Sequence, residues 1–394
     1  MSAGSWKESA KSFLRRALPP GIHDPVLASA RSIRDLAGSK AERRKLLLRH
    51  PVCLLGYSPR GLYPKVLSLC LTTRCNLRCF ICRRENVKVQ DLRFEKLFKV
   101  RNAIRHASTI DLTGWGESLL YPQFEDVLAY IFSLNARDDL IQITSNGTLL
   151  SGRLAALLAG HLGRMTLSLN AAKEETYNRE MRHGDFGKTM RSVRDFLSGL
   201  PEADRKKVLF HFVAHTGNFR EIPDFIRLAR DTGVFSVTVG QYLVDIAEHH
   251  RYSLLNAREE YNAVIRDGEA LGRELGVAFF ARRFFTEKAS SGFECVDPYD
   301  VCFVEVDGQV GPCCFCGSYR IGNVFDSGFE SVWFGEGYRK LRKRRYLPAC
   351  RNCSPFIPFD DPGAHFTAYL KEKEEFCEIH DMYGEITRSA KEAK

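Results

Sequence analysis

The sequence VLSLCLTTRCNLRCFIC at residues 66–82 joins a strand pattern to a metal-binding pattern. Residues 66–71 form a short apolar run that is typical of a buried strand. The loop after it places Cys75, Cys79 and Cys82 in a CxxxCxxC spacing. Three thiolates so close in sequence can each bind a different iron of one [4Fe–4S] cube, which leaves the fourth iron open to a small molecule. A zinc knuckle is the alternative, although zinc sites prefer paired CxxC or Cys/His sets.

Further short apolar runs follow this first strand at regular intervals. They occupy 108–113, 140–144, 165–169, 208–214 and 235–240, and helical patterns lie between and after them at about 93–106, 122–134, 149–159, 173–197, 220–232 and 257–275. Strands that alternate with helices predict parallel βαβ units in an α/β fold. Six units are too few for a closed eight-stranded barrel, so we expect an open, partial (β/α)6 barrel. Its site is expected at the C-terminal ends of the strands.

Charge and cysteine content divide the chain into three expected domains. Residues 1–65 form a basic N-terminal helical segment, with 13 Lys and Arg against 4 Asp and Glu, residues 66–276 form the barrel, and residues 277–394 form a cysteine-rich extension. A second basic run lies at 339–345. Because no aromatic platform or nucleic-acid module accompanies either run, we interpret both as solvated helix faces and expect no nucleic-acid partner.

Cysteine usage and hydropathy bear on the compartment. No run of about 18 apolar residues occurs, so no membrane span is expected. The N-terminus lacks the apolar core of a secretory signal, and we expect a cytoplasmic location. In a reducing compartment, the 13 cysteines indicate metal ligation or catalysis rather than disulfides.

Four motifs resemble those of the radical S-adenosylmethionine (SAM) superfamily, and the similarity extends over about residues 66–275. The segment TTRCNLRCFICRRE resembles the cluster loop that follows the first barrel strand of that family. Gly114-Trp115-Gly116-Glu117 is similar to its Gly-Gly-Glu motif, with Trp115 in place of the commoner glycine. Residues 144–150 and 167–170 resemble the endings of the third and fourth strands, with Asn170 where the family usually has Asp.

The resemblance implies a definite set of cofactors and site residues. Cys75, Cys79 and Cys82 are expected to ligate a [4Fe–4S] cluster that binds SAM. Glycines allow close approach of the backbone to a ligand, and Arg182 offers a fork of donors to the SAM carboxylate. The candidate SAM-binding residues are Gly114, Trp115, Gly116, Glu117, Ser145, Asn146, Ser168 and Arg182.

The chemistry implied by the resemblance is reductive cleavage of SAM. The reduced cluster gives one electron to SAM, the carbon–sulfur bond breaks, and the resulting 5′-deoxyadenosyl radical abstracts hydrogen from a substrate. An electron donor such as flavodoxin or ferredoxin is therefore expected as a partner. The part of the protein is to orient SAM and to exclude water.

The C-terminal region contains a second set of cysteines. The sequence VEVDGQVGPCC at 304–314 predicts a hairpin that turns on Asp307-Gly308. The region resembles the SPASM/twitch extension of radical SAM enzymes, which implies that Cys295, Cys313, Cys350 and Cys353 ligate an auxiliary [4Fe–4S] cluster. The full SPASM pattern adds two cysteines where this chain has SPFIPF at 354–359, so one auxiliary cluster is expected. A four-cysteine zinc site is the alternative.

Several cysteines and histidines fall outside both ligand sets. The remaining cysteines are Cys53, Cys70, Cys302, Cys314, Cys316 and Cys377, and most are expected to be small buried hydrophobes. Cys302, Cys314 and Cys316 lie beside the auxiliary set, and each is a candidate alternative ligand or catalytic hydrogen donor. Near the strand ends lie His211, His215, His249 and His250. A base there would suit an alcohol oxidation, and a structural or exposed role is the alternative for each.

Three functional hypotheses follow. The first is a radical SAM oxidoreductase, a dehydrogenase or epimerase, that acts on a small polar substrate such as a sugar, cyclitol or natural-product intermediate. A single auxiliary cluster favours it, because that cluster can accept the second electron of an oxidation. The second is a SPASM-type enzyme that modifies a ribosomally made peptide, ranked lower because residues 1–65 look helical rather than like a winged-helix peptide-binding domain. The third is a non-catalytic iron–sulfur protein, against which the open iron position argues.

Overall fold

The computed structural model describes residues 63–82, 87–242, 247–281, 297–311, 313 and 320–344. Within these ranges one sheet contains ten strands in the order β10-β9-β8-β1-β2-β3-β4-β5-β6-β7. All neighbours in the run β8-β1-β2-β3-β4-β5-β6-β7 pair in parallel. Strand β9 pairs antiparallel with both β8 and β10. The strands are β1 (Val66–Leu69), β2 (Thr109–Asp111), β3 (Ile141–Ser145), β4 (Leu162–Ser168), β5 (Val208–Ala214), β6 (Ser236–Gln241), β7 (Ala278–Phe280), β8 (Val301–Val304), β9 (Gln309–Gly311) and β10 (Gly322–Asn323).

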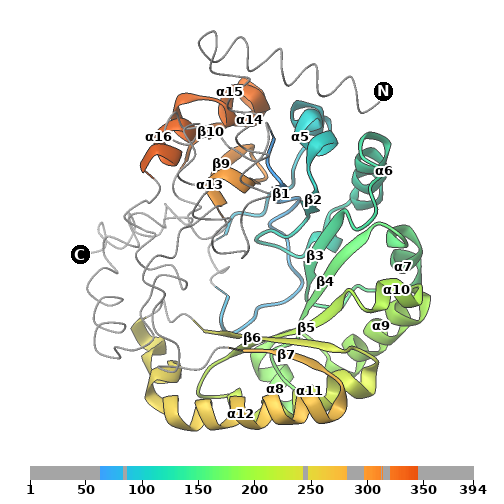
Figure 1. The fold of residues 1–394 in the computed structure, drawn as a ribbon, viewed down its shortest axis with the longest axis vertical. Helices are drawn as coiled ribbons and strands as arrows, with labels where there is room; N and C mark the ends of the chain where they lie inside the picture. Colours follow the sequence, from blue (N-terminus) through green and yellow to red (C-terminus); the bar gives the residue numbers. More distant parts are fainter. Residues whose placement is uncertain are drawn as a thin grey trace, which may run out of the picture.

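Helices connect the parallel strands and cover the outer side of the curved sheet (Figure 1). Those of the barrel are α5 (Arg101–His106), α6 (Phe124–Leu134), α7 (Gly152–Leu158), α8 (Glu174–Glu180), α9 (Phe186–Gly199), α10 (Glu202–Arg205), α11 (Ile222–Thr232) and α12 (Arg258–Leu275). The helices beside β8–β10 are α13 (Asp297–Asp300), α14 (Val324–Ser327), α15 (Phe329–Trp333) and α16 (Glu336–Arg344). Short 3-10 helices are η2 (Phe94–Val100), η3 (Ser118–Leu120), η4 (Phe219–Glu221), η5 (Ala247–Tyr252) and η6 (Leu254–Ala257).

The predicted α/β architecture with a partial barrel of parallel strands is confirmed, and all six predicted strands form as β1–β6. Two local predictions were wrong. The helix expected over 173–197 is two helices, α8 and α9, because the backbone leaves the helical region between them and His183 has φ +69°. The start of the expected extension at 277–394 also differs, because Ala278–Phe280 pairs with β6 as a seventh parallel strand.

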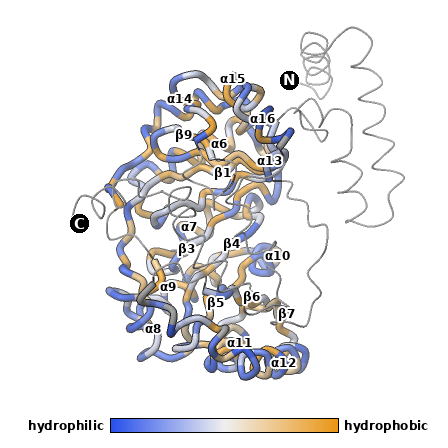
Figure 2. Tube along the Cα trace, turned by 90° about the vertical axis from the view of Figure 1, so that its left-hand side faces the viewer, coloured by the Kyte–Doolittle hydropathy of each residue, from blue (hydrophilic) through white to orange (hydrophobic). Residues whose placement is uncertain are grey.

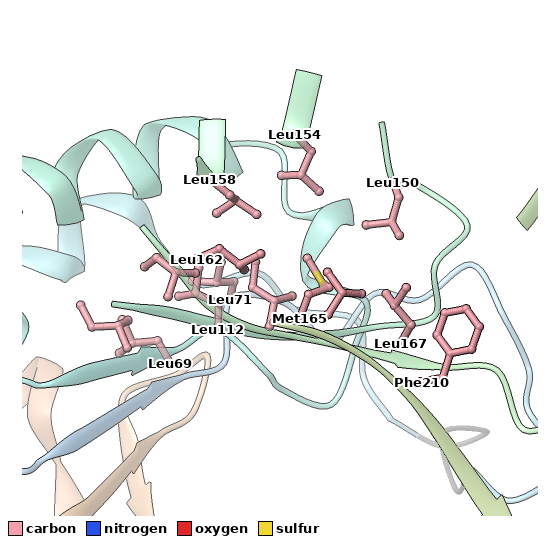
Figure 3. Packing of buried hydrophobic residues seen from close by; sticks show 14 of the residues in the cluster. Leu69, Leu71, Leu112, Leu150, Leu154, Leu158, Leu162, Met165, Leu167 and Phe210 are labelled. Carbon is pink, nitrogen blue, oxygen red and sulfur yellow. The ribbon is translucent and has the colours of Figure 1, made fainter. Parts of the chain in front are cut away.

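The outer face of the sheet is apolar and packs on the helices. Phe210 and Phe212 of β5 both contact the ring of Phe225 on α11, with ring centroids 5.7 and 5.0 Å apart. Figure 3 shows the same arrangement farther along the sheet, where side chains of β4 such as Leu162 and Leu167 lie beneath Leu154 and Leu158 of α7. Along α12 the buried residues recur every three or four positions, and Figure 2 shows this helix in alternating orange and blue. Burial of this apolar face stabilises the barrel.

The inner face of the sheet is polar across several consecutive strands. Parallel partners in register share a face, and the inward pairs are mostly polar. These pairs are Ser68 with Asp111, Asp111 with Gln142, Gln142 with Arg164, Thr144 with Thr166, Ser168 with His211, and His211 with Thr238. Most of these side chains are half-buried, unlike the fully buried outer positions between them. The inside of the open barrel is therefore lined with hydroxyl, amide and charged groups.

The predicted hairpin on Asp307-Gly308 is confirmed between β8 and β9. Gly308 has φ +85°, and the Asp307 Oδ1 accepts a hydrogen bond from the Gln309 amide at 3.0 Å. Strand β8 then pairs in parallel with β1, with Leu67 beside Cys302 and Leu69 beside Val304. The sheet thus continues across the expected boundary between residues 276 and 277.

Other expectations fall outside the residues that the structure describes. The basic N-terminal helices at 5–18 and 26–49 belong to this group, as do Cys295, Cys314, Cys316, Cys350 and Cys353. Within the described part of the chain, no helix is both long enough and apolar enough to cross a membrane.

Candidate functional site

The cysteine loop leaves β1 at the carboxyl edge of the sheet, where the blue trace runs along the inner side of the arc (Figure 1). Two backbone bonds fix this loop to the segment after α8: the Arg78 amide donates to the Arg182 carbonyl at 2.9 Å, and the Phe80 amide donates to the Glu180 carbonyl at 2.8 Å. The Cys79 thiol lies 3.6 Å from the Met181 sulfur. Chain segments that are distant in sequence therefore hold the cysteine loop at the mouth of the barrel.

The three thiols of the loop differ in exposure. Cys75 and Cys79 are half-buried, and Cys82 is exposed. Their sequence spacing favours an iron–sulfur cube, in which each thiolate binds a different iron, over the zinc knuckle.

Gly116 packs directly on the start of the cysteine loop. A Cβ atom at Gly116 would lie 2.2 Å from the Arg74 carbonyl oxygen and 2.6 Å from that of Thr72. The next amide, of Glu117, donates to the same Arg74 carbonyl at 2.7 Å. Only glycine fits this contact, because a side chain would force the two backbones apart. The motif after β2 is therefore locked against the loop after β1.

Glu117 and Asn146 connect three strand endings. The fully buried Glu117 carboxylate accepts from the Asn146 amide at 2.8 Å. Burial raises the pKa of Glu117, and hydrogen bonds from Asn146 and Ser145 oppose this shift. The Asn146 side chain donates to the Asn76 oxygen at 2.9 Å and lies 3.8 Å from the Cys75 sulfur. Both residues position the cysteine loop, and direct SAM contacts by them stay predictions.

The ending of β4 contains two of the singled-out positions. Ser168 is half-buried on the inner face. Asn170 adopts φ +58°, which asparagine tolerates better than most residues. Its oxygen accepts from the Val213 amide at 2.9 Å, and its nitrogen donates to the Met181 sulfur at 3.4 Å. A neutral amide here both accepts and donates, which an ionised aspartate cannot do. The amide joins the end of β4 to β5 and to the segment after α8.

Arg182 lies beside the cysteine loop, as a SAM ligand would require. Its carbonyl accepts from Arg78, its side chain is exposed, and its guanidinium carbon lies 5.8 Å from the centre of the Phe80 ring. Gly114 is packed tightly, since a Cβ there would lie 2.4 Å from the Cys70 sulfur. The assignment of SAM contacts to both residues stays a prediction.

His215 forms a buried pair with Glu180 that the sequence reasoning did not foresee. The His215 Nε2 lies 2.9 Å from a Glu180 oxygen, with side chains 1% and 5% exposed. The His215 Nδ1 accepts from the Gly217 amide at 3.1 Å, which leaves Nε2 to donate to Glu180. Burial alone would raise the pKa of Glu180, but its bonds to His215 and Arg179 lower it. Since the Glu180 carbonyl holds the Phe80 amide, this pair positions the cysteine loop.

The other singled-out histidines have different surroundings. His211 faces the inside of the barrel, its Nδ1 lies 2.8 Å from the Thr238 hydroxyl, and burial lowers its pKa. The His249 ring stacks on Phe80 at 4.6 Å, and its Nδ1 lies 2.8 Å from the Tyr242 hydroxyl. The side chain of His250 is outside the described residues. His211 is thus the histidine whose side chain reaches the polar inner face.

A second buried carboxyl group that the sequence reasoning missed is Glu305, directly after β8. Its two oxygens lie 3.1 and 3.0 Å from the Trp115 indole nitrogen, which donates to them. Glu305 is 9% exposed, and burial raises its pKa to about 7, opposed by the Trp115 bond. The sequence signal that could have pointed to Glu305 is its place between two valines, just before Asp307-Gly308 and at the end of a predicted strand. That pattern alone does not reveal which strand lies beside it.

The extension contributes two cysteines to the described residues. Cys302 of β8 shares the outer, helix-facing side with Leu67, is 1% exposed, and has its thiol pKa raised to about 12 by burial. This position favours a packing role over hydrogen donation into the barrel. Cys313 is half-buried just after β9. The auxiliary ligand set remains a prediction, because the other three residues lie outside the described ranges.

Two family models match the chain. Residues 69–229 match the radical SAM superfamily, and residues 295–354 match SPASM, an iron–sulfur cluster-binding domain. The second match contains all four predicted auxiliary ligands. These matches imply a SAM-binding [4Fe–4S] cluster in the barrel and auxiliary iron–sulfur binding in the extension.

Curated relatives include enzymes of small-molecule metabolism. A probable GTP 3′,8-cyclase of Methanothermobacter marburgensis is 28% identical over 74% of this chain and 95% of its own length. The GTP 3′,8-cyclase of Clostridium botulinum is 29% identical, but the chain covers only 52% of its length. A tungsten-containing aldehyde ferredoxin oxidoreductase cofactor-modifying protein of Pyrococcus furiosus is 22% identical over 74% of this chain and 87% of its own length.

Solved structures share the fold at low identity. SuiB of Streptococcus suis with bound S-adenosylmethionine aligns with a TM-score of 0.59 at 17% identity, covering 93% of this chain and 87% of that one. Native anSMEcpe with bound AdoMet aligns with a TM-score of 0.57 at 17% identity, covering 84% and 100%. The matches along the sequence and the geometry of the two loops agree. The chain therefore belongs to the radical SAM superfamily and carries a C-terminal SPASM domain.

Proposed function

We propose that this radical SAM enzyme abstracts a hydrogen atom from a small polar substrate bound inside the barrel, and that the substrate is oxidised or epimerised. The observation that carries this proposal is the polar inner face. Asp111, Gln142, Thr166 and His211 lie on adjacent strands of that face and are half-buried rather than sealed in the core. Such a lining offers many hydrogen-bond partners to a hydroxylated molecule, although Leu209 and Val213 add apolar surface on the same face.

The cofactors fit residues at the carboxyl edge of the sheet. Cys75, Cys79 and Cys82 would ligate the first cluster, and the loop endings at Gly116 and Ser168 would contact SAM. When bound, the cluster and SAM supply a carbon radical that removes a hydrogen atom from the substrate, and an auxiliary cluster can accept an electron. The protein orients these groups through the bonds of Glu117 and Glu180 to neighbouring loops. An external electron donor such as flavodoxin or ferredoxin is part of this proposal.

The relatives support a small-molecule substrate. The protein of M. marburgensis that shares 95% of its length with this chain is named a probable GTP 3′,8-cyclase, and a nucleotide is a small polar molecule. Peptide modification remains the alternative. One solved SuiB structure is described as bound to the precursor peptide SuiA, but at 16% identity that likeness concerns the fold alone.

The test is an assay of anaerobically reconstituted enzyme with SAM and dithionite. We expect 5′-deoxyadenosine in the wild type and none in a Cys75→Ala, Cys79→Ala, Cys82→Ala variant, which is the matched control. A panel of cyclitols, aminosugars and nucleotides that includes GTP is then analysed by mass spectrometry in H2O and D2O. Loss of two hydrogen atoms indicates oxidation, and uptake of one solvent deuterium without other change indicates epimerisation.

Three outcomes contradict the proposal in different ways. An isomer of GTP would indicate a cyclase like the named relatives. Conversion of a peptide, with all polar small molecules unchanged, would establish the peptide alternative. Intact SAM in the presence of strong reductant would support a non-catalytic iron–sulfur protein.

A further inference from the structure

Glu305 is a buried carboxyl group on the inner side of the barrel. Strand β8 pairs in parallel with β1, with Phe303 beside Ser68. Because side chains alternate along a strand, Glu305 continues the inner face on which Phe303 and Ser68 lie. The carboxyl ends of parallel strands meet at one edge, so Glu305 lies at the same edge as the cysteine loop. This placement depends on the SPASM hairpin joining the barrel sheet.

The contacts of Glu305 place it beside the Gly-Gly-Glu-like motif that follows β2. Its carboxylate accepts from the indole of Trp115, the residue that replaces a glycine in the Gly-Gly-Glu-like motif. The Trp115 ring meets Phe303 edge to face at 6.4 Å, and Cys70 and Val306 complete the apolar contact. The indole therefore has a fixed orientation, and it holds the carboxyl group against the motif after β2.

This carboxyl group has few partners for a buried acid. Glu117 accepts from two backbone amides and is held by Ser145, and Glu180 is bonded to His215 and Arg179. In contrast, the one side-chain donor to Glu305 among the described residues is the Trp115 indole, and no ion pair involves it there. A carboxylate has room for about four donors. With respect to the described part of the chain, Glu305 therefore has lone pairs left for a ligand proton.

Two charged groups of the described residues act on the pKa of Glu305. Asp307 on its own hairpin raises its pKa and Arg320 before β10 lowers it, while burial is the largest cause and brings the value to about 7. The Cys70 thiol lies in the same apolar contact. A carboxyl group whose pKa lies near the working pH can take up a proton and release it again.

We propose that Glu305 is the proton acceptor for the substrate. This inference rests on the proposed oxidation. When bound, SAM would supply the radical that takes a hydrogen atom from the substrate carbon, and an auxiliary cluster would accept the remaining electron. The Glu305 oxygen would take the proton of the adjoining hydroxyl. A carbonyl product results, and atoms and electrons balance. The Trp115 indole orients the acceptor oxygen and is a positioning residue.

The test compares wild type with Glu305→Gln, Glu305→Asp and Glu330→Gln in the reconstituted holoenzyme. Glutamine keeps the shape and the bond from Trp115 but cannot take up the proton. Glu330 is the matched control, because it is a half-buried carboxylate bonded to Tyr63 and Asn102 on the helical side. Each protein is incubated with SAM, dithionite and the polyol that the wild type oxidises. Both 5′-deoxyadenosine and the carbonyl product are measured.

We expect Glu305→Gln to lose about 100-fold in carbonyl product, in line with the usual contribution of a general base. The amount of 5′-deoxyadenosine that this variant forms should remain within about twofold of the wild-type amount. SAM cleavage would then be uncoupled from oxidation. Glu305→Asp should recover part of the product, and Glu330→Gln should match the wild type. Oxidation by Glu305→Gln at the wild-type rate overturns this inference alone. Failure of the wild type to oxidise any polyol overturns the proposed function and this inference with it.

A second readout does not depend on turnover. Infrared difference spectra between about pH 5 and about pH 9 should contain the carbonyl band of one protonated carboxyl group that titrates near neutrality. This band should be absent from Glu305→Gln and present in Glu330→Gln. Spectra of Glu305→Gln that match those of the wild type, with no carboxyl band lost, overturn the assignment.

Discussion

At the scale of single residues, three buried carboxyl groups at the carboxyl edge of the sheet differ in their partners. Glu117 and Glu180 are bonded to donors on neighbouring loops, and each bond positions the cysteine loop. Glu305 is bonded to the Trp115 indole alone among the described side chains. The number of donors therefore separates carboxylates that organise the loops from one that is available to a substrate.

The raised pKa of Glu305 leads to a prediction about stability. The folded-state pKa is about 7 and the ordinary value is 4.5, so folding opposes ionisation of this group. Its contribution to stability is complete below about pH 4.5 and is lost as the pH rises through about 7. Glutamine stays neutral, so Glu305→Gln should gain about 3 kcal/mol over the wild type at pH 8 and little at pH 4. Urea unfolding of the cluster-free proteins measures this, and an equal difference at both pH values contradicts it.

Predictions at the residue scale were possible where the chemistry is local in sequence. Cys75, Cys79 and Cys82 lie within one loop, and their spacing alone indicates a cluster. The pair of Trp115 and Glu305 joins residues 190 positions apart, and the pair of Glu180 and His215 also depends on how separate strands meet. Neither pair has a local pattern, because tertiary packing alone brings the partners together.

At the scale of elements, the contact between the loops after β1 and β2 depends on Gly116. Gly116→Ala would place a methyl group 2.2 Å from the Arg74 carbonyl oxygen, so the cysteine loop must shift. We expect the variant to retain its fold but to lose at least half of the iron bound at the first site. Gly152→Ala is the control, since its nearest contact is 3.7 Å away at the start of α7. Iron analysis after reconstitution measures the effect, and full loading of Gly116→Ala contradicts it.

The elements that could be predicted are those with a clear period. Strands β1–β6 are short apolar runs between helical patterns, and the Asp307-Gly308 turn predicts β8 and β9. Strand β7 lies at the end of the sheet and two of its three residues are exposed, so it lacks the buried apolar run of the other parallel strands. The division between α8 and α9 depends on the backbone at His183. The pairing of β8 with β1 could not be predicted either, because both strands are apolar and nothing local specifies a partner.

At the scale of the whole molecule, the SPASM region and the barrel share one sheet. Strand β8 covers the edge of β1 that an isolated six-stranded barrel would leave unpaired. Arg342 of α16, 1% exposed, adds to this by donating to the carbonyls of Pro298 and Trp333. The region that binds auxiliary iron is thus built onto the strand that leads to the first cysteine loop.

Because the barrel and the SPASM region share one sheet, the number of irons bound per chain reports on both regions. If the two regions each bind a cube, the anaerobically reconstituted wild type should contain about eight irons, and the Cys75→Ala, Cys79→Ala, Cys82→Ala variant about four. Cys70→Ala is the control, since Cys70 is buried and outside both ligand sets, and it should bind as much iron as the wild type. Iron, sulfide and zinc are measured together. A wild type with about four irons and a triple variant with none would mean that the extension binds zinc or no metal. The auxiliary electron acceptor, and with it the proposed oxidation, would then lose its basis, whereas SAM cleavage at the first site would remain.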